Sequence, residues 1–164
     1  MAGFFDPMEL RRFYFIKNSF FTAFPDPALM QNKEDGHKRP CFFAIEDEDN
    51  LLWMIPISSK VKKYQEIYDR KCAKSGRCDT LFFASVLGQR RTFLIQNAFP
   101  VTERFIDDIY LQAKTKKPVA ISDLESKELL SRFKRVLAMV KQGRRHLIFP
   151  DCLKIADTLK TEKQ

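Results

Sequence analysis

Two serines and a lysine stand where an apolar run ends and a helical pattern begins. The run NLLWMIPI ends at Ile57, and Ser58, Ser59 and Lys60 follow it directly. A serine is common at such a junction, because its hydroxyl can satisfy N–H groups that the first helical turn leaves unpaired. The same junction also suits a phosphate, since a helix start is positively polarised and the lysine adds a full charge. The sequence leaves both interpretations open.

A second group of cationic side chains precedes the other β-rich run of this region. Lys33, His37, Lys38 and Arg39 lie in a long loop with three prolines and a glycine, just before CFFAIE. Arginine can hold phosphate oxygens with two parallel hydrogen bonds, lysine can stabilise charge, and histidine can exchange protons near neutral pH. Exposed loops often carry such residues without a function, so their types alone do not establish a site.

The two groups can meet only if the chain folds back on itself between them. CFFAIEDED and NLLWMIPI are β-rich runs separated by an acidic turn, which predicts a hairpin with strands 41–46 and 52–57. In an antiparallel pair, the start of the first strand lies beside the end of the second. We therefore expect Arg39 and the Ser-Ser-Lys turn to share one rim of the sheet.

The rest of the chain predicts an α+β protein. Strands outnumber helices in the first two-thirds, and the longest helix begins at a capping box formed by Ser122 and Glu125. We expect one domain over residues 1–164: a compact, strongly twisted, mostly antiparallel β-sheet or barrel with packed helices. The predicted strands are 11–16, 79–86, 90–99 and 118–121; the predicted helices are 60–72, one from Thr102 with Phe105, Ile106, Ile109 and Tyr110 on one face, one from Ser122 to Gly143, and 151–161.

Basic residues are concentrated in the last third of the chain. Residues 113–164 hold 13 Lys and Arg against 6 Asp and Glu, whereas the whole chain has a formal charge of +8. A concentrated basic surface attracts polyanions, so nucleic acid is the first partner to consider, against the alternative of an ordinary solvated helix face. The candidate phosphate contacts are Lys127, Arg132, Lys134, Arg135, Lys141, Arg144 and Arg145; His37 and Tyr14 are further candidates for RNA contact, although Tyr14 also suits the core.

Several classes of protein are disfavoured by the sequence. No stretch approaches the roughly 20 apolar residues of a membrane span, and the start lacks a secretory pattern, so we expect a cytoplasmic protein that binds no membrane. HExxH, GxSxG and Walker motifs are absent. Cys41, Cys72, Cys78 and Cys152 lack the spacing of a zinc site, which predicts mostly buried free thiols and neither metal nor cofactor.

The remaining cationic and hydroxylic residues suit RNA cleavage without a metal. In that reaction the ribose 2′-hydroxyl attacks the adjacent phosphate, giving a 2′,3′-cyclic phosphate and a 5′-hydroxyl. The protein must accept one proton, donate another and stabilise the phosphorane between them. Arg39, Ser58 and Ser59 are candidates for holding the phosphate, and Lys33 or Lys60 for stabilising charge or moving a proton.

The chain also resembles the toxins of type III toxin-antitoxin systems, in the ToxN/AbiQ superfamily and most closely its CptN branch. The resemblance rests on FYFI, PDP, NK, RPCFF, WMIPISSKVKKY and FPVTE, and more loosely on VLAMVKQG and DCLKIADTLK. It implies an endoribonuclease with a MazF/Kid-like fold. The family's hydroxyl pair falls on Ser58 and Ser59, its cation on Arg39 or, in another alignment of the loop, on Lys33, and its following base on Lys60.

The same resemblance implies a set of partners. The antitoxin would be a small repeated RNA folded as pseudoknots, which the toxin cuts from a precursor and then retains in a closed protein–RNA assembly; other cellular RNAs would be substrates. No protein antitoxin is expected. Two alternatives remain: a non-catalytic RNA-binding module, and a MazF-like toxin held by a protein antitoxin.

Overall fold

The computed structural model describes residues 8–33 and 36–163, in which a twisted antiparallel sheet is covered by helices on both faces. The strands run in the order β4-β5-β3-β2-β1-β7, with β6 also paired to β3, and the sheet does not close into a barrel. The strands are β1 (Phe13–Ile16), β2 (Cys41–Glu46), β3 (Leu52–Ser58), β4 (Leu81–Val86), β5 (Gln89–Leu94), β6 (Phe99–Val101) and β7 (Ile106–Ile109). The helices are α1 (Asn18–Ala23), α2 (Val61–Ser75), α3 (Asp123–Lys141) and α4 (Cys152–Lys163), with short 3-10 turns at Ile95–Asn97, Glu103–Phe105 and Arg145–Leu147.

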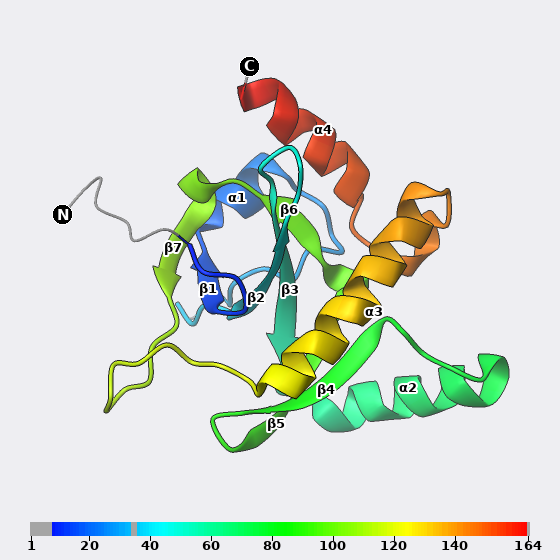
Figure 1. Cartoon of the computed structure of the whole chain (residues 1–164). Coiled ribbons are helices and arrows are strands. Elements are labelled where there is room, and N and C mark those ends of the chain that lie inside the picture. The colour runs from blue at the N-terminus through cyan, green and yellow to red at the C-terminus, as the bar shows by residue number, and fades with distance from the viewer. Residues whose placement is uncertain (1–7, 34–35, 164) are drawn as a thin grey trace.

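The central strands carry apolar side chains on both faces. On β3, Trp53 and Ile55 belong to one core cluster, while Leu52 and Met54 belong to another. This alternation follows from the two-residue period of a strand. The first cluster packs against α3 and the second against α1 and α4, and Figure 1 shows α3 crossing one face of the sheet. The many phenylalanines therefore serve mainly as core on both sides of the sheet.

Strand β3 changes its neighbour along its length. Leu52–Met54 pair with β6, whereas Ile57 and Ser58 pair with β5. Pro56 lies where β3 changes its neighbour. The N–H of Ile57 donates to the carbonyl of Pro40 on the β2 side, so an N–H at Pro56 would point to the opposite side, where the neighbour of β3 changes. A proline is tolerated in a central strand only where no ladder bond is required. The β4–β5 hairpin therefore pairs only with the end of β3.

Both predicted hairpins are confirmed, as are the helix after Lys60 and the two C-terminal helices. The predicted strand 90–99 is too long, because β5 ends at Leu94 and a 3-10 turn begins at Ile95. The predicted cap of α3 is confirmed at Ser122, whose hydroxyl accepts from the Glu125 N–H at 3.2 Å and donates to the Glu125 carboxylate at 2.9 Å. The α2 start differs in detail from the simple capping interpretation. Lys60 occupies the N-cap position without a side-chain cap bond, and Ser58 is the last residue of β3.

The predicted helix from Thr102 is wrong. A 3-10 turn leads into β7, which pairs with β1 through Tyr14 opposite Ile109 and Ile16 opposite Ile106. The open edge of β1 needs hydrogen-bond partners, and this requirement outweighs the helical spacing of the apolar residues. The predicted strand 118–121 is also wrong, since the segment makes only an isolated bridge between Leu111 and Pro118.

Among the described residues, no helix has the length and apolar character needed to cross a membrane. The same residues bring no three His, Cys, Asp or Glu side chains together as a set of metal ligands.

Candidate active site

A cleft opens at the end of the sheet where the loop before β2 meets the end of β3. Its volume is about 480 Å³, within the range of about 300–1,000 Å³ that is usual for small-molecule sites. The hairpin register places Cys41 opposite Pro56, so that Arg39 comes to the level of Ser58. The predicted meeting of these residues at one rim is confirmed. The described lining residues are Phe15, Lys33, His37, Lys38, Arg39, Pro40, Ile57, Ser58, Ser59, Val86, Leu87, Gln89, Arg91 and Tyr110.

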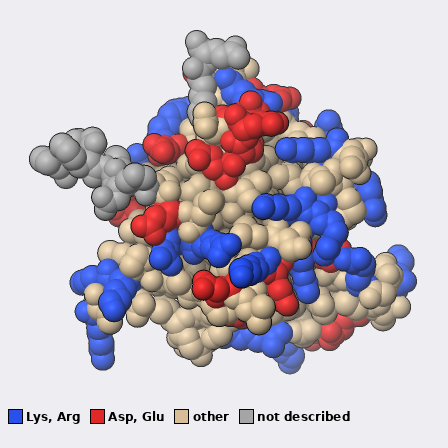
Figure 2. Space-filling view, viewed as in Figure 1, with Lys and Arg blue, Asp and Glu red and all other residues tan. Residues whose placement is uncertain are grey.

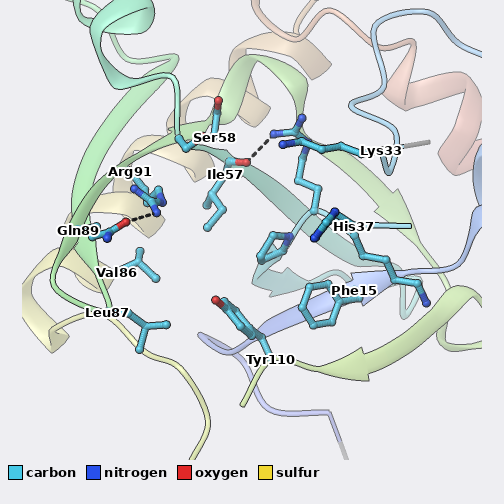
Figure 3. A pocket seen from close by; sticks show the side chains of 14 residues that line it. Phe15, Lys33, His37, Ile57, Ser58, Val86, Leu87, Gln89, Arg91 and Tyr110 are labelled. Carbon is cyan, nitrogen blue, oxygen red and sulfur yellow. Dashed lines mark hydrogen bonds between the residues drawn. The ribbon is translucent and has the colours of Figure 1, made fainter. Parts of the chain in front are cut away.

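Arg39 is fixed against the end of β3. Its Nη1 donates to the carbonyl of Ile57 at 2.8 Å, which Figure 3 shows as a dashed line. Its Nε is buried and has no hydrogen-bond partner among the described residues. A guanidinium held by one nitrogen can still direct its remaining N–H groups at an anion. The cation is therefore positioned before any ligand arrives.

Asn32 anchors the loop that carries these cations. Its Nδ2 donates to the carbonyl of Ile16 at 2.8 Å and to Oδ1 of Asn18 at 2.9 Å. Its Oδ1 accepts from the Arg39 N–H at 3.1 Å. One side chain thus ties both ends of the loop to the junction of β1 and α1.

Lys33 and His37 lie together at the mouth of the cleft. The Lys33 N–H donates to the carbonyl of His37 at 2.9 Å, and the Lys33 carbonyl accepts from the Gly36 N–H at 3.2 Å. Lys38, in contrast, forms an ion pair with Asp107. Lys33, His37 and Arg39 all line the cleft beside Lys38.

The two serines differ in what they offer. Ser58 is only 5% exposed, and its Oγ accepts from the Lys60 N–H at 3.2 Å. Ser59 is exposed, and its carbonyl accepts from the Val61 N–H at 2.9 Å, directly before α2. Lys60 is exposed and adjacent to the cleft but does not line it. Ser59 and the positive end of α2 are therefore the more accessible parts of the junction.

Cys41 lies beside this site but has no nucleophilic character. Its thiol donates to the carbonyl of Arg39 at 3.7 Å. Burial raises the pKa of Cys41 to about 12, even though the charge of Arg39 acts in the opposite direction. The thiol therefore stays protonated at neutral pH.

Tyr14 does not lie in the cleft. It is 6% exposed, its ring packs against Phe43, and its hydroxyl accepts from the Glu9 N–H at 2.9 Å. Because Tyr14 points into the core on one face of β1, its ring presents no face to an RNA base. Its placement does not support the expected role in RNA contact.

The basic residues of the last third lie outside the cleft. Lys127, Lys134 and Lys141 are exposed along α3, and Figure 2 shows Lys and Arg side chains spread over the same side of the molecule as α3. Arg132 lies over the Phe82 ring and donates to the carbonyl of Leu81 at 3.2 Å, while Arg135 pairs with Asp79 at 3.2 Å. Arg144 and Arg145, just beyond α3, are exposed, although Nη1 of Arg144 lies 3.4 Å from Met139 Sδ.

Asp79 is the carboxylate most affected by these arginines. Burial acts to raise its pKa, but hydrogen bonds and charges from Arg77 and Arg135 outweigh burial, and the pKa of Asp79 is lowered. Arg135 is thus partly neutralised, whereas Lys127, Lys134 and Lys141 have no carboxylate partner in the described part of the chain.

Phe15, Gln89, Arg91 and Tyr110 line the cleft without having been predicted from the sequence. Phe15 comes from β1, Tyr110 directly follows β7, and Gln89 and Arg91 lie at the start of β5. The adjacent arginines 90 and 91 after the Leu-Gly turn are the signal that could have drawn attention to β5. The helical spacing around Tyr110 predicts a helix face, which conceals its position at the end of a strand.

Comparison with known proteins finds a solved structure with a similar architecture. No family model and no curated protein sequence matches the chain. The structure of AbiQ, described as a lactococcal anti-phage endoribonuclease belonging to the type III toxin-antitoxin system, matches with a TM-score of 0.70 and 14% sequence identity. The match covers 95% of this chain and 100% of the AbiQ chain. The fold expected from the ToxN/AbiQ resemblance is therefore confirmed: the chain has an AbiQ-like fold.

Proposed function

We propose that this protein is the endoribonuclease toxin of a type III toxin-antitoxin system. The observation that carries the proposal is the cleft, in which Arg39, Ser58, Ser59, Lys33 and His37 converge from two segments of an AbiQ-like fold. None of the fourteen described lining residues is acidic, so the cleft is suited to a phosphate.

In the proposed reaction the RNA supplies the nucleophile. The 2′-oxygen attacks the adjacent phosphorus while its proton leaves, and the bond to the 5′-oxygen breaks as that oxygen gains a proton. Arg39 and the Ser59 hydroxyl stabilise the phosphorane charge, and the polarised start of α2 with Lys60 adds to the field. Lys33 and His37, at the cleft mouth, are the candidates for proton transfer. Ser58 supports the turn through its bond to the Lys60 N–H. No step in this scheme calls on a metal.

The proposal extends to the partners. A repeated pseudoknot RNA would be both substrate and inhibitor, held in a closed protein–RNA assembly in the cytoplasm, and cellular RNAs would be the toxic targets. The α3 lysines support this part, because exposed cations outside the cleft can contact the backbone of an RNA longer than the cleft holds.

The test is cleavage of a long RNA by the purified protein in the presence of EDTA, with analysis of the fragment ends. We expect discrete cuts that leave 2′,3′-cyclic phosphate. Ser59→Ala should slow cutting by about 10²- to 10³-fold, the usual cost of losing one donor to a developing oxyanion. Ser59 is a cleaner probe than Ser58, whose hydroxyl also supports the turn before α2.

Two further variants complete this experiment. Arg39→Lys keeps the charge but loses the planar fork, and should also slow cutting strongly. Ser85→Ala, at an exposed serine of β4 outside the cleft, is the matched control and should cut normally. Tight RNA binding without cuts by the intact protein would instead favour a binding module.

The nature of the antitoxin has a separate test in the neighbouring DNA. Short direct repeats beside the gene are expected for an RNA antitoxin. An adjacent reading frame whose product binds and inhibits the protein would replace this part of the proposal with a MazF-like system.

A further inference from the structure

Two aromatic rings form the floor of the cleft. Phe15 and Tyr110 are both half-buried, and their ring centroids are 5.3 Å apart with the planes tilted by 59°. Most other phenylalanines near the sheet are buried, so these two rings differ in facing an open space. Figure 3 shows the Tyr110 ring directed into the cleft, with Phe15 beside it.

The backbone holds this floor in place from both sides. Phe15 lies within β1, and the N–H of Tyr110 donates to the carbonyl of Phe13 at 2.8 Å. The carbonyl of Tyr110 accepts from the Val119 N–H at 3.0 Å. The rings are therefore set by the sheet itself and do not depend on a flexible loop. No side-chain hydrogen bond of Tyr110 is made within the described part of the chain.

The walls above the floor are cationic or polar. Figure 3 shows Lys33 and His37 on one side of the cleft and Gln89 and Arg91 on the other, and Arg39 also lines the cleft. Nη2 of Arg91 donates to Oε1 of Gln89 at 2.5 Å, and Nη1 donates to the carbonyl of Arg90 at 3.0 Å. These bonds fix the guanidinium of Arg91 at the cleft. An aromatic floor between cations suits a ligand that combines a planar ring with an anionic group.

We infer that Phe15 and Tyr110 form a nucleobase subsite, in which one unpaired base next to the scissile phosphate stacks on Tyr110 while Gln89 and Arg91 face its edge. The inference rests on the proposed RNA ligand and adds the residues that contact one of its bases. Aromatic side chains stack on any base, and single-stranded RNA is recognised mainly through such exposed bases. A cleft of about 480 Å³ is large enough to hold a single splayed nucleotide. Cutting is therefore confined to positions where the RNA is unpaired.

Binding of an uncleavable probe tests the subsite without relying on catalysis. The probe is a short single-stranded RNA, 2′-O-methylated at every position, with 2-aminopurine at alternate positions, because the fluorescence of 2-aminopurine falls when it stacks. The wild-type protein should quench this fluorescence. Tyr110→Ala should abolish the quenching and weaken binding roughly 5- to 150-fold, the range expected for removing one base–aromatic stack.

Two variants serve as controls for this effect. Tyr110→Phe keeps the ring and should retain both the quenching and the affinity. Phe149→Ala removes an exposed ring, 53% accessible, that lies outside the cleft, and should also leave both unchanged. Quenching that survives Tyr110→Ala, or that disappears in Phe149→Ala instead, would overturn the assignment.

A second measurement changes the probe and compares the wild-type protein with Tyr110→Ala. Replacing the quenched 2-aminopurine by an abasic residue should weaken binding to the wild-type protein by the same factor, and should cost nothing further in Tyr110→Ala. Equal affinity for the abasic and intact probes would contradict a base subsite.

The outcomes separate this inference from the proposed function. Cutting of RNA by a protein that neither quenches the probe nor depends on Tyr110 would leave the nuclease intact and remove the subsite. Stacking on Tyr110 without any cutting would keep the subsite and remove the nuclease. Binding of a protein ligand to the cleft, with no affinity for the probe, would remove both.

Discussion

At the scale of single residues, the geometry of the cleft depends on side chains that do not line it. Asn32 is the clearest example, because it uses both ends of its amide to join the end of β1 to the backbone of Arg39. An amide is required here, since it must donate and accept at once, whereas a carboxylate could only accept. The position of Arg39 is therefore set seven residues earlier in the chain.

Asn32→Ala should lower both the rate of RNA cutting and the stability of the fold. Removing the hydrogen bonds of a partly buried amide costs about 1–3 kcal/mol of folding free energy. Displacing Arg39 by about 1 Å is expected to slow cutting by about 10²-fold. Cleavage rates and thermal melts check this prediction. Asn18→Ala, which removes only one of the three bonds, is the control and should remain near wild type in both.

Asp79 gives a pH-dependent contribution to stability. Its pKa is lowered in the folded protein, so its contribution is present above the unfolded pKa and is lost as the pH falls through the folded value. Asp79→Asn should therefore melt below wild type at pH 7, and the difference should shrink as the pH falls below about 4. Melting curves from pH 7 to pH 3 measure this. A constant difference over that range would show that charge pairing with Arg77 and Arg135 is not the cause.

At the scale of elements, the sequence predicted strands and helices correctly wherever the local pattern and the tertiary environment favour the same structure. Two β-rich runs separated by an acidic turn identified β2 and β3, and the Ser122–Glu125 pair located the start of α3. The helix predicted over residues 106–109 was wrong because the helical spacing favours a helix while the free edge of β1 favours a strand, and pairing with β1 prevails. Tyr110 was absent from the predicted site for the same reason.

The exposed lysines of α3 should control the salt dependence of RNA binding. Changing Lys127, Lys134 and Lys141 to Gln together should reduce the slope of log affinity against log salt by about 2, because each neutralised phosphate of single-stranded RNA accounts for about 0.7 of the slope. The slope is measured by titration from 50 to 300 mM salt. Changing Lys154 and Lys160 of α4 to Gln is the control, since Lys160 is already paired with Asp49 and Asp157. An unchanged slope in the α3 variant would remove these residues from the RNA interface.

At the scale of the whole molecule, the sequence could place Arg39 beside Ser58 but could not assemble the cleft. That pair comes from one hairpin, so its register follows from local pairing. Phe15, Arg91 and Tyr110 meet these residues only through the order of strands in the sheet, and no local pattern encodes that order. The proposed phosphate site was therefore predictable in part, whereas the base subsite was not.

Burial in the folded protein should also give the four thiols different reactivities. Cys41, Cys78 and Cys152 are buried, and burial raises the pKa of Cys41 to about 12 and that of Cys152 to about 11. Cys72 is half-buried. Iodoacetamide at pH 8 should label Cys72 first, and the other three should react only after denaturation; peptide mass spectrometry checks this. Rapid labelling of Cys41 in the native protein would mean that the start of β2 opens readily.

The cleft draws on residues from Phe15 to Tyr110, which has a consequence for synthesis on the ribosome. A nascent chain lacks one side of the cleft until β7 and Tyr110 have left the exit tunnel. At about 5–20 residues per second, translating the first 110 residues alone takes roughly 5 to 20 s. We expect chains stalled before that point to leave RNA intact and released full-length chains to cut it, so the newborn protein would spare its own messenger during most of translation. Cutting by a stalled chain that lacks Tyr110 would show that the hairpin rim is active alone.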